Sequence, residues 1–338
     1  LVVLVVMYLA ALCAALVAPH GADNNYPRYA SVPPQTLYWI ERSAQGWQFN
    51  PHVLGYQSVI DKTTRSRIVT VDPNTRHAVR WMVPTEPYTL LGVLPLRHKL
   101  FGTVDRDAPF FLLGSDRLGR DVFSRIIEGS RVSLTIGLVG VAISLVLGVL
   151  LGGVSGYFGG WVDNAIQRLI EMLQSLPTIP LWMGLAAAIP AGMPPLQVYF
   201  FITIILSVLG WTSLAREVRS KFMALKTEDF VTAARLDGAS HMRTIRRHMA
   251  PSMVSHIIAT VTLAIPGMIL AETSLSFLGI GLRAPAVSWG VLLQDAQNVQ
   301  TLAAAPWLLF PVAAVVIAVL AFNFVGDGLR DAADPYAH

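Results

Sequence analysis

Long apolar blocks constrain the fold of this chain more than any other feature of its sequence. One block runs over Val132–Tyr157, and similar blocks cover about Val198–Ala215, Ser252–Ala271 and Pro306–Val325. About 20 apolar residues in a helix are enough to cross the hydrocarbon core of a bilayer. The chain is 54% hydrophobic and only 14% charged, whereas soluble domains carry about 25% charged residues. The sequence therefore predicts an integral membrane protein.

Two further blocks raise the expected number of transmembrane helices to six. Leu1–Ala18 is about as long as the shortest spans and has no basic region before it. We interpret residues 1–18 as a first transmembrane helix that lacks its start, with a signal peptide as the alternative. Ala165–Pro190 contains Glu171, Pro177 and Pro180, so this span is expected to be kinked or broken.

Three glycines in the second span are expected to mark a packing surface. Gly148, Gly152 and Gly156 recur every four residues and therefore lie on one face of a helix. This spacing lets a second helix approach closely in a membrane. Helix packing explains the pattern better than a ligand site does.

The polar residues 19–110 are expected to form a small extramembrane subdomain. They are rich in proline, but they also carry tryptophans and many other apolar residues. Arg65–Val71 and Arg76–Val83 read as two strands of a hairpin, joined by a turn at Asp72–Thr75. Residues 111–134 mix apolar and charged positions and are expected to be an amphipathic interfacial segment. A five-helix core then covers 132–338.

The distribution of basic residues predicts the orientation of the helices. The connection over residues 216–251 carries eight basic side chains, whereas the connection over 191–197 carries none. Because positive charge near spans marks the cytoplasmic side, 216–251 is expected in the cytoplasm. Counting spans outward places both termini in the cytoplasm and residues 19–110 outside.

Several classes of function lack their sequence motifs. No G-x-x-x-x-G-K-[ST] loop is present, so the chain is not expected to bind ATP itself. It also lacks HExxH, CxxC and EF-hand patterns, and the single cysteine, Cys13, forms no internal disulfide. The formal charge of +4 is not arranged as a basic stripe with aromatic residues, which argues against nucleic acid as a partner. We expect no cofactor, metal or catalytic site in this chain.

The most informative stretch is the basic connection itself. Residues 228–238 read as a short helix with acidic residues near its start, which suits the helix dipole, and with Gly238 at its end. Small residues at Ala233, Ala234 and Ala239 leave a low profile that could fit a groove on a partner. The alternative, an ordinary basic loop that only fixes topology, has equal weight on these grounds.

This stretch resembles the E-A-A-x-x-x-G-x(9)-I-x-L-P signature of ABC importer permeases. Ala233, Ala234, Gly238 and Pro251 match in register, whereas Thr232, His248 and Ala250 replace the glutamate, isoleucine and leucine. In that family the segment is the coupling helix that docks on the ATPase subunit. The resemblance implies an ATPase-coupling role for this set: Asp229, Thr232, Ala233, Ala234, Gly238, Ala239 and Ser240.

Two other segments are similar to the second, C-type permease of dipeptide, oligopeptide and nickel transporters. Leu113–Arg125 and Gly129–Leu134 resemble L-G-T-D-x-x-G-R-D-x-x-S-R…G-x-R-x-S-L, and Glu272–Gly281 resembles E-x-x-L-S-F-L-G-L-G. The resemblance covers about residue 111 to the C-terminus. It implies an all-α permease of six transmembrane helices with the type I ABC importer fold, carrying an extracytoplasmic insertion after the first helix.

The resemblance also implies partners, a location and a function. The partners would be a second homologous permease, two ATPase subunits that hold ATP and Mg²⁺, an extracytoplasmic substrate-binding protein and membrane lipid. The location would be the bacterial inner membrane. The cargo would be peptides, with metal chelates such as nickel, opines and sugars as alternatives; the chain itself would do no covalent chemistry.

Two acidic residues in or beside spans are candidates for the translocation path. Glu171, with Arg168 one turn earlier as its expected partner, should face the subunit interior or the cytoplasmic end of the bundle; a snorkelling surface position is the alternative. Glu272 is the second candidate. A membrane-embedded enzyme fits less well, because neither glutamate has a His or Cys partner at a suggestive spacing. An ion-coupled transporter also fits less well, because the sequence lacks obvious inverted repeats and the coupling motif would go unexplained.

Overall fold

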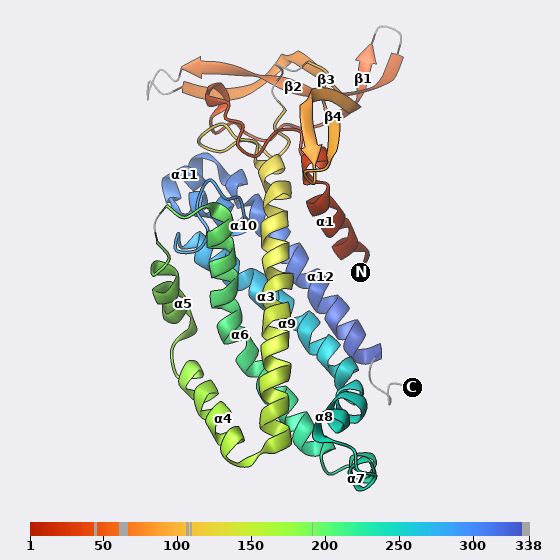
Figure 1. The fold of residues 1–338 in the computed structure, drawn as a ribbon. Coiled ribbons are helices and arrows are strands. Elements are labelled where there is room, and N and C mark those ends of the chain that lie inside the picture. The colour runs from red at the N-terminus through yellow and green to blue at the C-terminus, as the bar shows by residue number, and fades with distance from the viewer. Residues whose placement is uncertain (44–45, 61–66, 106–107, 109, 191, 333–338) are drawn as a thin grey trace. The chain divides into compact units, whose positions relative to one another are not determined.

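A computed structural model describes residues 1–43, 46–60, 67–105, 108, 110–190 and 192–332 (Figure 1). The chain divides into two compact units. We call residues 2–133 with 283–316 the sheet unit, and residues 134–282 with 317–332 the helical unit. Two helices, α3 at Val122–Phe158 and α12 at Phe310–Ala332, contribute residues to both units.

The sheet unit contains four antiparallel strands in the order β1-β2-β3-β4. Their bounds are β1 Tyr38–Ser43, β2 Gly46–Ile60, β3 Arg67–Leu90 and β4 Leu94–Thr103. β3 and β4 are joined by a tight turn in which Leu91 and Gly92 both have positive φ, as in the turns that match the twist of a hairpin. Val53, Val79 and Phe110 form a small buried core under the sheet.

This sheet corrects two expectations. The all-α fold class is wrong for the insertion, because residues 38–103 are largely strand. The hairpin turn at Asp72–Thr75 is also wrong, because β3 continues through it as one strand and the two flanks both pair with β2: Gly55 opposes Asp72 and Leu54 opposes Arg76. Arg65 and Ser66, the expected start of the hairpin, lie outside the described residues.

Asp72 nevertheless forms a local turn within β3. The Asp72 carboxylate accepts hydrogen bonds from the backbone N–H of Asn74 and the hydroxyl of Thr75 at 3.0 and 2.5 Å. This local turn is typical of aspartate. It produces a bulge within a long strand, where the sequence alone had suggested a reversal of the chain.

Short helices complete the sheet unit. α1 spans Val2–Leu12 and α2 spans Ala14–Val17, with a break at Cys13, and a 3-10 turn covers Pro27–Tyr29. Two short helices, α10 at Trp289–Gln294 and α11 at Val299–Ala304, are capped by the side chains of Ser288 and Asn298, as expected for serine and asparagine at helix starts. Further 3-10 turns cover Asp295–Gln297 and Pro306–Leu309, and α12 spans Phe310–Ala332.

The segment expected at the membrane interface, residues 111–134, is not one element. Residues 111–121 form a loop, and 122–134 are the first turns of α3, which runs without interruption over Val122–Phe158. Asp121 starts this helix by accepting hydrogen bonds from the backbone N–H and the hydroxyl of Ser124, at 2.9 and 2.5 Å. Capping by Asp121 therefore moves the start of the helix ten residues earlier than the apolar block suggests.

Asp116 organises the loop before α3. One carboxylate oxygen accepts the backbone N–H groups of Leu118 and Arg120 at 2.8 and 2.9 Å. The other accepts Arg120 Nε at 2.7 Å and a terminal nitrogen of Arg125, on α3, at 2.6 Å. Asp116 and Arg125 are 2% and 4% exposed, so the loop is held to the helix by a buried ion pair. The motif over 113–125 thus has a structural role.

The helical unit is built from long apolar helices. Besides α3, it contains α4 Gly160–Gln174, α5 Thr178–Ala187, α6 Pro195–Leu225 and α9 Val254–Phe277. Among the described residues, four helices are long and apolar enough to cross a membrane, namely Val122–Phe158, Pro195–Leu225, His241–Phe277 and Pro306–Ala332. Val2–Leu12 and Thr178–Ala187 are shorter apolar helices. The expected third span is broken between α4 and α5, which confirms the interpretation of its prolines.

The glycine repeat of α3 packs against α6. A Cβ atom at Gly152 would lie 2.4 Å from the backbone oxygen of Ala215, and one at Gly156 would lie 2.5 Å from that of Arg219. Neither distance is compatible with a side chain. The prediction that the repeat is a helix-packing surface is therefore confirmed.

Candidate functional site

The connection between α6 and α9 folds into two short helices. α7 spans Asp229–Leu236 and α8 spans His241–Thr244, and two further turns, Ile245–Met249 and Pro251–Met253, lead into α9. Val231 of α7 and Met249 are fully buried. They pack in one apolar cluster with Val218 and Phe222 of α6 and with Tyr157 at the end of α3. The connection is therefore fixed to the ends of the long helices.

Gly238 ends α7 in a Schellman motif. Its φ is +80°, a conformation that favours glycine. The N–H of Ala239 donates to the carbonyl of Ala234 and the N–H of Gly238 donates to that of Arg235, both at 3.0 Å. This pair of bonds satisfies the last carbonyls of a helix. A Cβ at Gly238 would meet no atom within 4 Å, so the requirement for glycine comes from the backbone alone.

Tyr157 anchors the connection to α3. Its ring is 2% exposed, and its hydroxyl lies 2.6 Å from Nδ1 of His241. The guanidinium of Arg235 lies over the same ring at 5.4 Å and the ammonium of Lys226 at 5.9 Å, within the range of a cation–π contact. One buried tyrosine therefore holds residues from α7, from α8 and from the end of α6.

An ion pair next to this region ties α6 to α4. Arg219 donates two hydrogen bonds to the Asp163 carboxylate, at 2.5 and 2.6 Å, and Ser155 of α3 donates a third at 2.5 Å. The two hydrogen bonds from Arg219 and the one from Ser155 fix the ends of three helices to one carboxylate.

The outward face of α7 differs in part from the expected one. Val231 and Ala234 are buried, and at about 100° per residue the positions opposite them are Asp229, Thr232, Ala233 and Leu236. These four, which we call the outward face of α7, are all exposed. Ala234, which the resemblance includes in the ATPase-coupling set, is 8% exposed and therefore lies on the inward side of α7.

Large apolar side chains on and beside the outward face of α7 could not be identified as exposed from the sequence. Leu236 is 84% exposed, Met242 of α8 is 64% exposed and Phe230 is 43% exposed. Exposed apolar side chains that gather on one segment mark interaction sites. Leu236 follows Ala233 by three residues and Thr232 by four, so helical spacing places all three on one face. This spacing can be read from the sequence. Gly238 and Ser240 are exposed and Ala239 is half-buried.

Comparison with known proteins identifies the family. The model of the family described as "Binding-protein-dependent transport system inner membrane component" matches residues 144–337. The chain belongs to this family of transport permeases. The resemblance drawn from its motifs is thereby confirmed, and the permease is a multi-pass protein of the inner membrane.

Individual relatives agree with this assignment. The permease is 39% identical over 224 residues to the dipeptide transport system permease protein DppC of Bacillus subtilis, covering 66% of this chain and 68% of the relative. It is 37% identical over 223 residues to the oligopeptide transport system permease protein OppC of the same organism, covering 66% and 70%. Among solved structures, an inward-facing methionine transporter, MetNI, is similar with a TM-score of 0.49 and 17% identity, over 63% of this chain and 97% of that chain.

The two acidic candidates lie in different environments. Glu171 pairs with Arg168 at 2.9 Å, as expected, but its side chain is 53% exposed and does not face the interior of this subunit. Glu272 is fully buried in α9, where its carboxylate accepts a hydrogen bond from Ser276 at 2.8 Å. Ser276 in turn accepts the N–H of Leu282 at 3.0 Å. The motif over 272–281 therefore shapes the turn after α9.

A tyrosine-to-phenylalanine change tests the anchor of the connection. Tyr157→Phe keeps the buried ring but removes the hydroxyl that meets His241, which should cost about 1 kcal/mol. We expect faster hydrogen exchange in residues 229–249 and a small fall in the melting temperature of the purified permease. Tyr199→Phe, which removes a tyrosine hydroxyl from α6 far from this connection, is the control. Unchanged exchange in Tyr157→Phe would show that the hydroxyl does not hold the connection.

Proposed function

We propose that this permease is one of two membrane subunits of an ATP-driven importer of peptides. The similarity to DppC and OppC, whose names assign them to dipeptide and oligopeptide transport, supports the peptide cargo. The partners would be a second homologous permease, two ATPase subunits and an extracytoplasmic binding protein. ATP and Mg²⁺ would be held by the ATPase subunits, and this chain would carry out no covalent step.

The exposure of the outward face of α7 is the observation that supports a coupling role. α7 combines a rigid attachment, through Val231 and Tyr157, with an exposed surface that ends in Leu236. A helix that is fixed on one side and exposes Leu236 on the other can transmit a displacement from a partner to the ends of α3, α6 and α9. Transport then follows from differential contacts of α7 in the two states of the ATPase pair.

The positive-inside rule supports one membrane topology for this permease. The connection that carries α7 would lie in the cytoplasm with both termini, and residues 19–110 would lie outside, where the binding protein delivers its cargo. Six crossings require Val2–Leu12 and the pair α4 and α5 to cross with the four longer helices. The second permease would cover the apolar surfaces that the long helices leave exposed.

Uptake by the assembled transporter tests the function. The complex, purified through a tag on this chain and placed in liposomes, should take up a radiolabelled dipeptide only with ATP and the binding protein present. Nickel, an opine and a sugar, each with the same complex, serve as comparison cargoes. ATP-dependent uptake of one of these in place of the dipeptide would contradict the peptide assignment, and a complex without an ATPase subunit would contradict the importer itself.

A further inference from the structure

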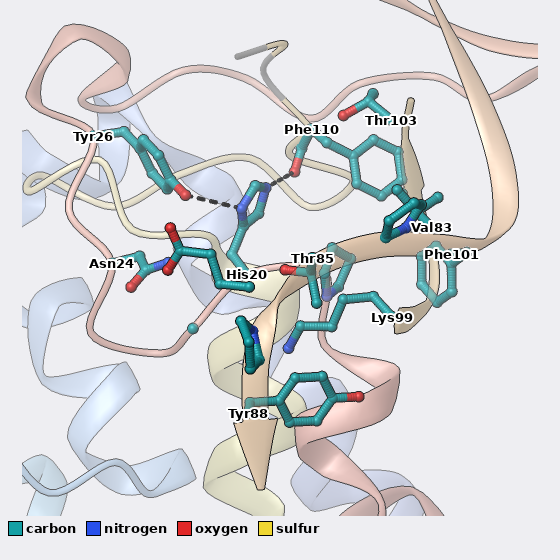
Figure 2. Close-up of a pocket in the computed structure, with 16 residues that line it drawn as sticks. His20, Asn24, Tyr26, Val83, Thr85, Tyr88, Lys99, Phe101, Thr103 and Phe110 are labelled. Atoms are coloured by element: carbon teal, nitrogen blue, oxygen red, sulfur yellow. Dashed lines mark hydrogen bonds between the residues drawn. The ribbon is translucent and has the colours of Figure 1, made fainter. Parts of the chain in front are cut away.

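The sheet unit contains two adjoining cavities, of about 420 and 630 Å³. They share four lining residues, His20, Gly21, Tyr88 and Lys99. The smaller one lies between the segment after α2 and strands β3 and β4 (Figure 2). Together they are large enough for a compact ligand the size of a short peptide, since ligand sites range from about 300 to 1,000 Å³.

Lys99 supplies a half-buried positive charge to both cavities. Figure 2 shows its side chain extending from β4 toward the ring of Tyr88, and Nζ lies 4.5 Å from the centre of that ring. Nζ donates one hydrogen bond, to the carbonyl of Ala15 at 2.7 Å. No ion pair among the described residues includes Lys99. An ammonium has three N–H donors, so two remain for a ligand.

Burial makes an anionic ligand favourable at this point. Removal of water lowers the pKa of the Lys99 ammonium, and the charge of Glu128 opposes that shift. Glu128 does not neutralise Lys99 by contact, because its carboxylate pairs with Arg131 at 2.9 Å. A ligand carboxylate on Nζ would compensate for the water that the ammonium has lost.

The opposite sign of charge is also present in the lining. Asp23 lines the larger cavity and Glu86 the smaller one, and neither takes part in an ion pair among the described residues. Glu128 and Arg131 also line the larger cavity, but they pair with each other at 2.9 Å. A site that offers the Lys99 ammonium and separate carboxylates suits a ligand that carries both charges. It suits a phosphate group less well, because the carboxylates would repel it.

The wall opposite Lys99 is held in place by His20. Its Nε2 lies 2.9 Å from the carbonyl of Phe110 and its Nδ1 lies 3.2 Å from the hydroxyl of Tyr26 (Figure 2). The ring also stacks on Phe111 with centres 5.5 Å apart. Because the carbonyl can only accept, Nε2 donates and Nδ1 accepts from Tyr26. The cavity is therefore bounded by an aromatic cluster that is already held in place. Binding of a ligand would not carry the entropy cost of ordering these side chains.

We propose that these cavities bind a small zwitterionic ligand, with its free carboxylate on Lys99 Nζ and its amine toward Glu86 or Asp23. The inference rests on the proposed function for the identity of that ligand, a short peptide with free ends. The peptide would occupy the sheet unit in addition to any site among the long helices.

The test compares peptides that differ in one charge. The probes are Ala-Phe, Ala-Phe amide and N-acetyl-Ala-Phe, and the sample is the purified transporter in phosphatidylcholine nanodiscs without the binding protein. Loss of a charge-assisted hydrogen bond should raise the Kd of the amide about tenfold or more relative to Ala-Phe. Lys99→Met should raise the Kd of Ala-Phe by a similar factor and abolish the difference between acid and amide.

A neighbouring basic residue provides the control. Arg97 lies two residues earlier on β4, is exposed and does not line either cavity, so Arg97→Met should leave every Kd unchanged. Equal affinity for acid and amide, or no effect of Lys99→Met, would overturn the proposal. An effect of Lys99→Met confined to retention of added phosphatidylglycerol would overturn it in favour of a lipid site.

The same samples separate this inference from the proposed function. Normal ATP-dependent uptake of Ala-Phe with unaltered binding in Lys99→Met would refute the cavity site alone. Failure of the wild-type complex to take up any peptide would refute the proposed function, whereas Lys99-dependent binding of Ala-Phe in that case would still support the site.

Discussion

Replacing Asp116 with alanine is expected to destabilise the sheet unit by about 3–5 kcal/mol, because the change leaves a buried arginine without its counter-charge. The Asp116 carboxylate accepts four hydrogen bonds, two of them from arginine side chains. Arg125 is 4% exposed and its Nε has no partner among the described residues. The purified variant should be digested much faster by protease within residues 19–121 than the wild-type permease.

Two variants make this prediction specific. Asp295→Ala removes the partner of Arg117, a pair at 2.6 Å whose arginine is 57% exposed, and should cost no more than about 1 kcal/mol. Arg125→Met combined with Asp116→Ala should recover part of the stability, because no unpaired charge remains at that position. Wild-type resistance to protease in Asp116→Ala would show that the loop before α3 does not depend on the ion pair.

Leu236→Asp is expected to reduce binding of the ATPase subunits about tenfold or more without unfolding the permease. Leu236 is 84% exposed in this chain, so an aspartate costs the isolated subunit no more than about 1 kcal/mol, from the carboxylate at the C-terminal end of the helix. In an interface the same side chain would be desolvated, and an unpaired carboxylate there would be strongly unfavourable. Co-purification of the ATPase with the tagged permease, together with ATP-dependent uptake, measures the effect.

Variants of Ala234 and Val299 distinguish an effect on ATPase docking from an effect on the folding of the permease. Ala234→Arg places a charge where the side chain is 8% exposed, so it should disturb the packing of α7 itself and lower the melting temperature. Val299→Asp changes an equally exposed apolar residue, 78% exposed on α11, and should leave ATPase binding intact. Equal co-purification of the ATPase with Leu236→Asp and the wild type would argue against the outward face of α7 as the contact.

The long helices could be predicted from sequence because apolar length is a strong signal. The blocks at 132–157, 198–215, 252–271 and 306–325 each lie within a helix of the structure. Their ends could not be predicted, because polar turns extend the helices past the apolar blocks. α3 begins at Val122 under the control of Asp121, and α6 continues to Leu225 past the pair of Arg219 and Asp163.

The insertion shows where local pattern is insufficient. Asp72, Pro73 and Asn74 have the chemistry of a turn, and the structure contains that turn. Whether a turn reverses a chain or only bulges a strand depends on the partner strand, and β2 pairs on both sides of it. Such pairing between distant residues leaves no signal in a single short stretch of sequence.

The sequence predicts where α7 ends, but not which of its faces is buried. Gly238 at the end of α7 follows directly from its sequence context, and Asp229, Thr232 and Ala233 are exposed as the coupling role requires. The inward position of Ala234 could not be predicted, because small size alone does not say which face of a helix is buried. The inward direction is set by Val231 and by the cluster around Tyr157, which lies more than 70 residues earlier in the chain.

Site-specific crosslinking tests the central claim, contact between α7 and the ATPase, most directly. Single cysteines would replace Thr232 and Leu236 on the outward face, and Ala234 on the inward face, in a Cys13→Ala background. In the assembled transporter, the first two should crosslink to the ATPase subunit with a short reagent and the third should not. Absence of a crosslink from both Thr232 and Leu236, or an equally strong crosslink from Ala234, would contradict the account.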